Sequence, residues 1–254
     1  YEIRPRDWSS DVCSSDLSVS PINLLIEHIL GASQITYTDV TPLAQLFNAY
    51  VAYVVKADSP LKSGRDIVAK LKSDPASVSF AVAAALGGSN HVATMVAMKS
   101  AGVDVKKLKF VVFTSGVQSL TSVMGGHVDV AAMPVSGVAS QLGAGKVRVV
   151  AVSSPKRLGG QLATVPTWKE QGADSTFSSS RGVIGPKGMS AAQIAYWENV
   201  LARVVESDDW KKEIETNFWD SQFLGSADTR KMLKSQYDEY KSVLVDVEIG
   251  RAHV

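Results

Sequence analysis

The stretch that decides the fold is residues 77–100, SVSFAVAAALGGSNHVATMVAMKS. Its first seven residues are apolar and small, which predicts a buried strand over 77–83. A glycine-rich loop follows at 86–91, and the segment 92–100 reads as a helix. A strand that leads through a short loop into a helix is the repeating unit of a parallel α/β sheet.

The same unit recurs along the chain. Apolar runs predict strands at 51–55, 109–113, 128–132 and 147–152. Ser63 and Asp66 form an N-terminal signal for a helix at 67–71, which Asp74-Pro75 ends. Further helices are expected after 114–116, ending near 125–126, and after 134–136, ending at 143. This alternation predicts a parallel, doubly wound sheet.

The rhythm changes after Pro166. Residues 176–184 are expected to be extended. Ser190 and Gln193 have the spacing of a capping box, which predicts a helix over 191–205. A short helix over 210–217 and a long one over 229–247 complete the expected elements.

The two ends of the chain are related to each other. DVCSSDL (11–17) and EIGRAHV (248–254) can be encoded by one piece of DNA read on opposite strands, and that DNA resembles a sequencing adapter. We therefore read 1–17 and 248–254 as adapter-derived, with no fold. The alternative is a genuine terminal tail. On the adapter reading, residues 18–247 are an N-terminally truncated segment that has lost its start and any secretion signal.

Composition excludes several classes of protein. The chain has 26 Lys and Arg against 25 Asp and Glu, which disfavours a nucleic-acid-binding face. Cys13, the only cysteine, lies in the excluded end, so disulfides, a thiol nucleophile and cysteine zinc sites are not expected. No apolar run is long enough to span a bilayer. Neither a cofactor nor a metal is predicted.

Three loops share a chemistry suited to anions. They are 87–90 (GGSN), 113–116 (FTSG) and 133–136 (MPVS), each following a predicted strand. Glycines allow close approach to the backbone, hydroxyls add donors, and the first turn of a helix favours an anion. Ligands of open α/β sheets bind at this edge. These loops predict a small-anion or carboxylate site, although each loop alone could be only a turn with a helix cap. None matches a nucleotide-binding pattern.

Catalytic candidates are few. His91 could donate to an anion, or it could cap or pack. His127 and Asp129 could bind a metal, but no third ligand has helpful spacing. Ser136 lacks the glycine pattern of a hydrolase nucleophile. Arg181 could grip a carboxylate with two hydrogen bonds, or it could be solvated or salt-bridged. His28, on an apolar stretch, is expected to be structural.

Several motifs in series resemble the receptor component of tripartite tricarboxylate transporters, the Bug family. The resemblance covers nearly all of 18–247. It rests on order and spacing, since no single motif is decisive. The motifs are GGSNH (87–91), Phe113 with Gly116, MGGHVD (124–129), GAGKVR (143–148), AVSS (151–154), VPTWKEQG (165–172) and RGVIGP (181–186).

This resemblance implies a type II periplasmic-binding-protein fold, in which two doubly wound α/β lobes close on a ligand and the chain crosses between them twice. Crossings are expected near 55–59 and 176–181. Lobe 1 would be 18–57 with 177–247, and lobe 2 would be 58–176. Lobe 1 is expected to be incomplete, because the family's first strand and first glycine-rich loop would lie before Ser18.

The resemblance also implies that Gly88, Ser89, His91, Phe113, Thr114, Ser115 and Met133 to Ser136 line the half of the site in lobe 2. With Asn90, Gly116 and Arg181, which the residues themselves suggest, the predicted ligand-binding residues are Gly88, Ser89, Asn90, His91, Phe113, Thr114, Ser115, Gly116, Met133, Pro134, Ser136 and Arg181. The sequence departs from the family pattern in having Met133 and Pro134 where a polar residue is frequent, and Ser180 where an aromatic residue often lies beside the arginine.

The expected function is that of a periplasmic solute-binding receptor. It would capture a di- or tricarboxylate or an aromatic acid and hand it to the permease subunits of the transporter. We expect a monomer that is not an enzyme and does not bind nucleic acid. The alternatives are a ligand-sensing effector domain of a regulator, which shares the fold, and a small α/β hydrolase.

Overall fold

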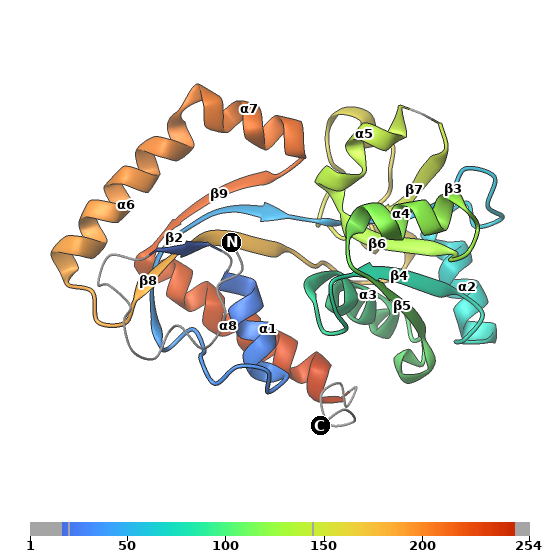
Figure 1. Ribbon diagram of the computed structural model, residues 1–254, viewed down its shortest axis with the longest axis horizontal. Helices are drawn as coiled ribbons and strands as arrows, with labels where there is room; N and C mark the ends of the chain where they lie inside the picture. The colour runs from blue at the N-terminus through green and yellow to red at the C-terminus, as the bar shows by residue number, and fades with distance from the viewer. Residues whose placement is uncertain (1–16, 20, 144, 247–254) are drawn as a thin grey trace. The chain divides into compact units, whose positions relative to one another are not determined.

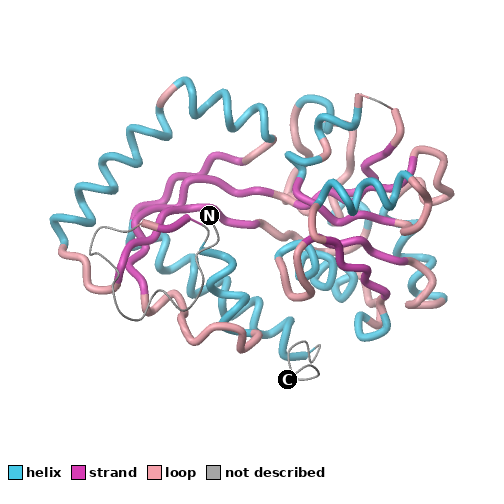
Figure 2. Tube along the Cα trace, viewed as in Figure 1, coloured by secondary structure: helices cyan, strands magenta, loops and turns pink. Residues whose placement is uncertain are grey.

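The computed structural model describes residues 17–19, 21–143 and 145–246, and Figures 1 and 2 trace their path. Residues 1–16 and 248–254, which hold nearly all of the predicted adapter-derived ends, lie outside the described residues. The chain forms two compact units. Unit 1 takes Tyr1–Asn48, Ser180–Glu215 and Asp220–Val254, and unit 2 takes Ala49–Ser179 and Thr216–Trp219.

Unit 2 is an α/β unit. Its strands are β3 (Val51–Lys56), β4 (Ser79–Ala83), β5 (Lys109–Phe113), β6 (Val130–Pro134) and β7 (Val147–Val152). Its helices are α2 (Gly64–Ser73), α3 (Ser89–Ser100), α4 (Gly116–Met124) and α5 (Ala139–Leu142).

The strands of unit 2 form one sheet in the order β5-β4-β6-β3-β7. β4 pairs in parallel with β5 and β6, whereas β3 runs antiparallel to both β6 and β7. Four strands therefore point the same way and β3 points against them. The sequence predicted a parallel sheet, and the reversal of β3 is not encoded in its apolar pattern, because burial on both faces looks alike in either direction.

This arrangement defines two edges of the sheet. We call the edge where β4, β5, β6 and β7 end the carboxyl edge, and the edge where they begin the amino edge. Because β3 is reversed, it begins at the carboxyl edge.

The helix starts of unit 2 follow local sequence signals. The Ser63 hydroxyl accepts from the Asp66 amide, and the Asp66 carboxylate accepts in return from the Ser63 amide at 2.9 Å, which confirms the predicted start of α2. Gly64 opens this helix beside the buried Trp168. A Cβ on Gly64 would lie 2.5 Å from the indole ring, so only glycine lets α2 pack there. Trp168 meets Tyr53 edge to face at 4.8 Å in the core.

Unit 1 contains a four-stranded sheet in the order β1-β8-β2-β9. Its strands are β1 (Ser18–Val19), β2 (Val40–Ala49), β8 (Ser179–Pro186) and β9 (Asp220–Gly225). Its helices are α1 (Pro21–Ile29), α6 (Ala191–Glu206), α7 (Asp208–Asn217) and α8 (Ser226–Asp246). The Ser190–Gln193 capping box is present at the start of α6, as predicted.

Two close contacts set the packing of unit 1. A Cβ on Gly182 of β8 would overlap the carbonyl oxygen of Ala44 on β2, so glycine is required for these strands to approach. His28 of α1 bonds through Nδ1 to the Tyr237 hydroxyl of α8 at 2.9 Å. The expected structural role of His28 thus corresponds to a contact between two helices.

The first division of the chain falls at another position than expected, and the second falls within the predicted crossing near 176–181. The first boundary lies between Asn48 and Ala49, so β3, expected in lobe 1, belongs to the sheet of unit 2. The second lies between Ser179 and Ser180. The chain also returns to unit 2 at Thr216–Trp219, where Phe218 lies against Gly160. β2 and β3 are separated by Tyr50 alone, so the apolar pattern gives no sign of the point where strand partners change.

Candidate anion-binding edge

Four loops follow the four parallel strands at the carboxyl edge of unit 2. They comprise residues 84–88, 114–115, 135–138 and 153–159. The first three overlap the predicted ligand-binding loops 87–90, 113–116 and 133–136, whose other residues lie at the adjoining strand ends and helix starts. The fourth follows β7, and the sequence analysis did not assign it to the site. Its signal was present, because Ser153-Ser154 directly follows a predicted strand, as the other three loops do.

Direct contacts tie these loops together. The amide of Ala84 donates to the carbonyl oxygen of Phe113 at 2.8 Å, which joins the first two loops. The methyl group of buried Met133 lies 3.5 Å from the position of a Cβ on Gly116 and 3.0 Å from one on Gly137. The apolar side chain of Met133 therefore packs against the second and third loops.

The first loop has a strained shape that His91 holds. Ala84 adopts φ of +71° and Gly87 φ of +86°, the left-handed region in which an alanine is uncommon. The His91 ring is 3% exposed, and its Nδ1 accepts a hydrogen bond from the Gly87 amide at 2.9 Å. Its other face meets Phe110 edge to face at 4.3 Å.

These contacts decide the state of the His91 ring. Burial lowers its pKa to about 4 from the usual value near 6.5, so the ring is neutral at pH 7. Since Nδ1 accepts, the single ring proton is on Nε2. Of the two roles considered for His91, the geometry favours packing and shaping of the loop over a charged contact with an anion.

The starts of α3 and α4 differ in their capping. The N-cap of α3 is Gly88, and no side chain caps this helix. Its first helical hydrogen bond runs from the Val92 amide to the Gly88 carbonyl oxygen, so the N–H groups of Ser89, Asn90 and His91 belong to the open first turn. These N–H groups and the helix dipole favour an anion at the carboxyl edge.

At α4 the protein supplies its own cap. The Ser115 hydroxyl accepts from the Gln118 amide at 3.3 Å. The Gln118 side chain in turn accepts from the Thr114 amide and hydroxyl, at 3.3 and 2.8 Å. The open amides of this turn are those of Gly116 and Val117. α4 is thus partly satisfied internally, and α3 is the stronger anion donor.

The third loop contains Ser136, the residue considered for a hydrolase. Ser136 is half-buried and Pro134 exposed. The histidines in the described part of the chain are engaged elsewhere. His28 bonds to Tyr237, His91 shapes its own loop, and His127 lies beside Gly125 near the start of β6. Among the described residues, none of these histidines is hydrogen-bonded to Ser136, so the serine–histidine pair of a hydrolase is not formed there.

Charge is distributed unevenly between the two edges. The four loops at the carboxyl edge contain no Asp or Glu. Asp74, Asp104 and Asp129 instead precede β4, β5 and β6 at the amino edge. The Asp129 carboxylate accepts from the Ser79 amide and hydroxyl at 2.8 and 2.7 Å, which fastens the starts of β4 and β6. Asp129 therefore serves strand pairing, and the described residues contain no cluster of three potential metal ligands.

In unit 1, Arg181 is half-buried on β8, and burial lowers the pKa of its guanidinium. The same unit holds an amide cluster that the sequence analysis missed. The side-chain nitrogen Nε2 of Gln45 donates to Asn48 Oδ1 at 3.0 Å and to Gln222 Oε1 at 2.9 Å. Asn48 Nδ2 donates to the same Gln222 oxygen at 2.7 Å. Only the pairing of β2 with β9 brings these residues together.

The described residues contain no helix that is long and apolar enough to cross a membrane. The two α/β units, with the chain passing between them, form the type II periplasmic-binding-protein fold of solved solute-binding proteins. Residues 30–249 match the model of the tripartite tricarboxylate transporter family receptors, so the chain belongs to this family of solute-binding receptors. The resemblance and the fold class predicted from the motifs are thereby confirmed.

Individual relatives are distant in sequence and similar in fold. A protein from the gbd 5′ region of Cupriavidus necator is 21% identical, over 98% of this chain and 76% of its own. A TctC solute-binding protein from Polaromonas superposes with a TM-score of 0.75 at 21% identity, covering 91% and 77% of the two chains. MatC of Rhodopseudomonas palustris, solved with bound malate, gives 0.70 at 16% identity, covering 90% and 78%. An R. palustris protein solved with adipate gives 0.73 at 19%, covering 91% and 77%.

Proposed function

We propose that this receptor captures a small carboxylate at the carboxyl edge of unit 2. It would act outside the cytoplasm and deliver the ligand to the membrane permease subunits of a tripartite tricarboxylate transporter. The observation that carries the proposal is the open first turn of α3, whose three N–H groups lie at an edge whose four loops contain no Asp or Glu.

Electrostatics supports an anionic ligand. A carboxylate bound to first-turn amides gains charge-assisted hydrogen bonds and meets the positive end of the helix dipole. Because the four loops contain no Asp or Glu, no fixed negative charge within them opposes binding. The bound malate and adipate of two structural relatives are carboxylates, which agrees with this class of ligand.

The predicted ligand-binding residues divide into proposed roles. Amides and hydroxyls would bond to the ligand, apolar side chains would contact its carbon chain, and buried side chains would shape the loops. The proposed donors are the backbone amides of Ser89, Asn90, His91 and Gly116 and the hydroxyl of Ser136. The proposed apolar contacts are Phe113 and Pro134. The His91 ring, Ser115 and Met133 would support the loops. Gly88 and Thr114 would do the same, because the Gly88 amide donates to the Ala85 carbonyl oxygen and both donors of Thr114 bond to Gln118.

We infer binding without turnover, in a periplasmic and monomeric receptor. A calorimetric titration tests the proposal with malate, adipate, citrate and benzoate, and with the neutral diamide of succinic acid as control. We expect saturable binding of at least one carboxylate, no heat from the diamide, and no hydrolysis of an ester panel. Equal binding of the diamide would contradict the proposal, and so would ester turnover that Ser136→Ala abolishes.

A further inference from the structure

The loop after β7 presents a lysine at the proposed ligand edge. The Ser153 hydroxyl donates to the Phe177 carbonyl oxygen at 2.7 Å and accepts from the Val51 amide at 2.9 Å, which fixes the start of the loop. The Ser154 hydroxyl donates to the carbonyl oxygen of Lys156 at 2.6 Å. The backbone that carries Lys156 is therefore held by two buried serines.

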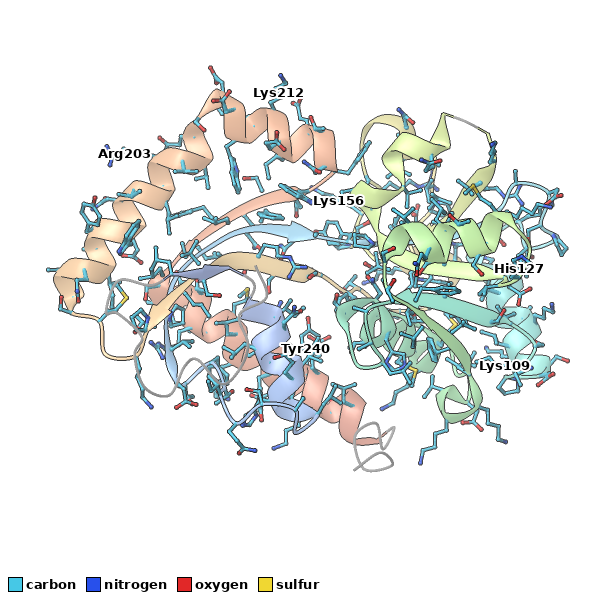
Figure 3. The ribbon with its side chains drawn as sticks, in the orientation of Figure 1. Lys109, His127, Lys156, Arg203, Lys212 and Tyr240 are labelled. Carbon is cyan, nitrogen blue, oxygen red and sulfur yellow. The ribbon has the colours of Figure 1, made fainter. Side chains whose placement is uncertain are left out.

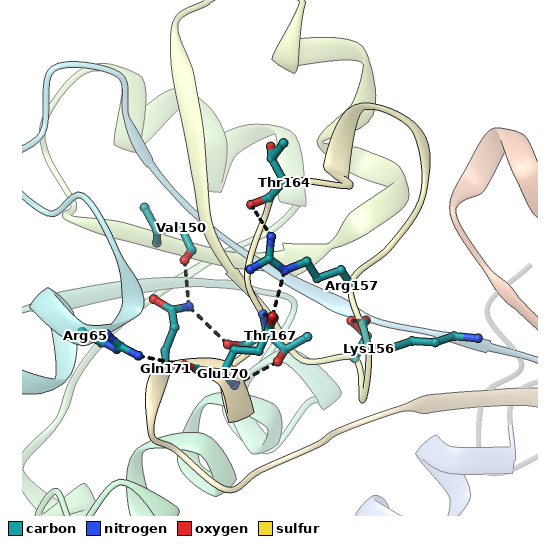
Figure 4. A network of polar contacts seen from close by, with 9 residues as sticks. Arg65, Val150, Lys156, Arg157, Thr164, Thr167, Glu170 and Gln171 are labelled. Carbon is teal, nitrogen blue, oxygen red and sulfur yellow. Dashed lines mark hydrogen bonds and ion pairs between the residues drawn. The ribbon is translucent and has the colours of Figure 1, made fainter.

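The next residue, Arg157, is engaged with the protein itself. Its Nε lies 2.9 Å from Glu170 Oε1, and the second oxygen of Glu170 accepts from the Thr167 amide at 2.8 Å. Arg65 donates to the Glu170 carbonyl oxygen at 3.0 Å. The charge of Arg157 is thus neutralised by Glu170, and this network anchors the far side of the loop (Figure 4).

Lys156 is placed differently. Its side chain is exposed and extends away from the Arg157 network in Figure 4. In Figure 3 it lies on the opposite side of unit 2 from Lys109 and His127, which mark the amino edge. Within residues 17–19, 21–143 and 145–246, no ion pair involves Lys156, whereas Lys56, Lys107 and Lys169 of the same unit each pair with an aspartate.

We propose that Lys156 is a specificity-determining residue that pairs with the second carboxylate of a dicarboxylate ligand. The first carboxylate would occupy the open turn of α3. The inference rests on the proposed function of this edge. The amides and hydroxyls of the loops are neutral donors and can hold one carboxylate. A second negative charge would find its counter-charge in Lys156, since Arg157 is already paired with Glu170.

The test compares two ligands of equal length and different charge, adipate and its monomethyl ester. Lys156→Met removes the charge and keeps much of the side-chain volume. Lys146→Met is the matched control, because Lys146 is an exposed lysine at the other end of the same strand, β7. We expect Lys156→Met to weaken adipate binding about tenfold and monoester binding less than about twofold, while Lys146→Met changes neither. Lys156→Arg should retain the preference for adipate.

The outcomes separate this inference from the function on which it rests. If Lys156→Met weakens both ligands by the same factor, or Lys146→Met has the same effect as Lys156→Met, Lys156 contributes only general attraction and the inference is wrong. If the unmodified chain binds neither ligand nor any other carboxylate, the proposed function itself fails. Binding of the monoester with unchanged adipate preference in Lys156→Met overturns the inference alone.

Discussion

The two edges of the sheet in unit 2 are built from the same strands but differ in their charged side chains and in the capping of their helices. At the amino edge, Asp129 fastens β4 to β6, and Asp104 pairs with Lys107 at 3.3 Å. At the carboxyl edge the loops have no carboxylates, and the first turn of α3 has no side-chain cap. At the amino edge, carboxylate side chains thus bond to other groups of the protein. At the carboxyl edge, the first turn of α3 offers its N–H donors to an external anion.

The contrast shows how a helix start that can bind a ligand differs from one that is capped by its own side chains. A helix start is ordinarily stabilised by its own N-cap side chain, as α2 and α6 are by serine capping boxes. Because the N-cap of α3 is glycine, the missing side-chain cap forgoes only about a few tenths of a kcal/mol of stability. The buried His91 instead holds the loop in shape without covering the turn.

A negative charge at the carboxyl edge is expected to have the largest effect. Ser89→Asp places a carboxylate at the start of α3, where it should occupy the anion position itself. Repulsion between two charges about 4 Å apart near a protein surface is about 4 kcal/mol, so carboxylate affinity should fall roughly a thousandfold. Calorimetry measures this, and the thermal stability should not fall, because an acid is favourable at this end of a helix.

The matched control for Ser89→Asp is Ser100→Asp, which adds the same charge at the other end of α3. We expect its affinity to equal that of the unmodified chain, with a small loss of stability from the unfavourable dipole. Equal losses of affinity in both variants would mean that net charge, and not the edge, decides binding.

Low pH should reduce the free energy of unfolding through His91, which shapes the first loop of the carboxyl edge. Its folded pKa of about 4 is below the unfolded value near 6.5, so only the unfolded chain takes up this proton between those values. The stabilising contribution is complete above about pH 6.5 and is lost as pH falls towards 4, by about 3 kcal/mol. In His91→Asn, denaturant unfolding should show a smaller loss over this window. The same pH dependence in both proteins would show that His91 is not the group responsible.

Arg181, on β8 of unit 1, tests the ligand contact that the sequence predicts for it. Its predicted ligand contact gives an expected loss of about 2 kcal/mol, roughly thirtyfold in affinity, for Arg181→Ala. Arg203→Ala, an exposed arginine on α6, is the control and should bind normally (Figure 3). Unchanged affinity in Arg181→Ala, measured by calorimetry, would assign this half-buried side chain to structure.

The smallest effect is expected at the amino edge. Asp129→Asn weakens the two hydrogen bonds to Ser79 and should cost roughly 1 kcal/mol of unfolding free energy in denaturant titrations. Carboxylate affinity should not change, because this residue precedes β6 and the proposed ligand edge follows it. A loss of affinity comparable to that of Ser89→Asp would remove the distinction between the two edges.

Several elements of both units could be predicted from local signals. The serine caps of α2 and α6, the apolar runs of β5 and β7 and the end of α4 near Gly125 all lie where the sequence placed them. These features depend on neighbouring residues only. The reversed direction of β3, the strand β9 and the return of Phe218 to unit 2 depend on partners far along the chain, and no periodicity reports them.

The candidate site was predictable in part for the same reason. Glycine and serine after each strand located three of the four loops at the carboxyl edge. The role of His91 required the distance from its Nδ1 to the Gly87 amide, since the sequence allowed both a ligand contact and a packing role. The amide cluster of Gln45, Asn48 and Gln222 arises from strand pairing over more than 170 residues and carried no local signal.

The central claim is that a carboxylate binds at the carboxyl edge of unit 2. Amide chemical shifts of the isotope-labelled chain, recorded during titration with malate or adipate, test it residue by residue. The account predicts that the largest shifts occur at Gly88 to His91 and at Gly116, with the amides next to Asp74, Asp104 and Asp129 unchanged. Shifts centred on those aspartates, or saturable binding that leaves the first turn of α3 unperturbed, would contradict it.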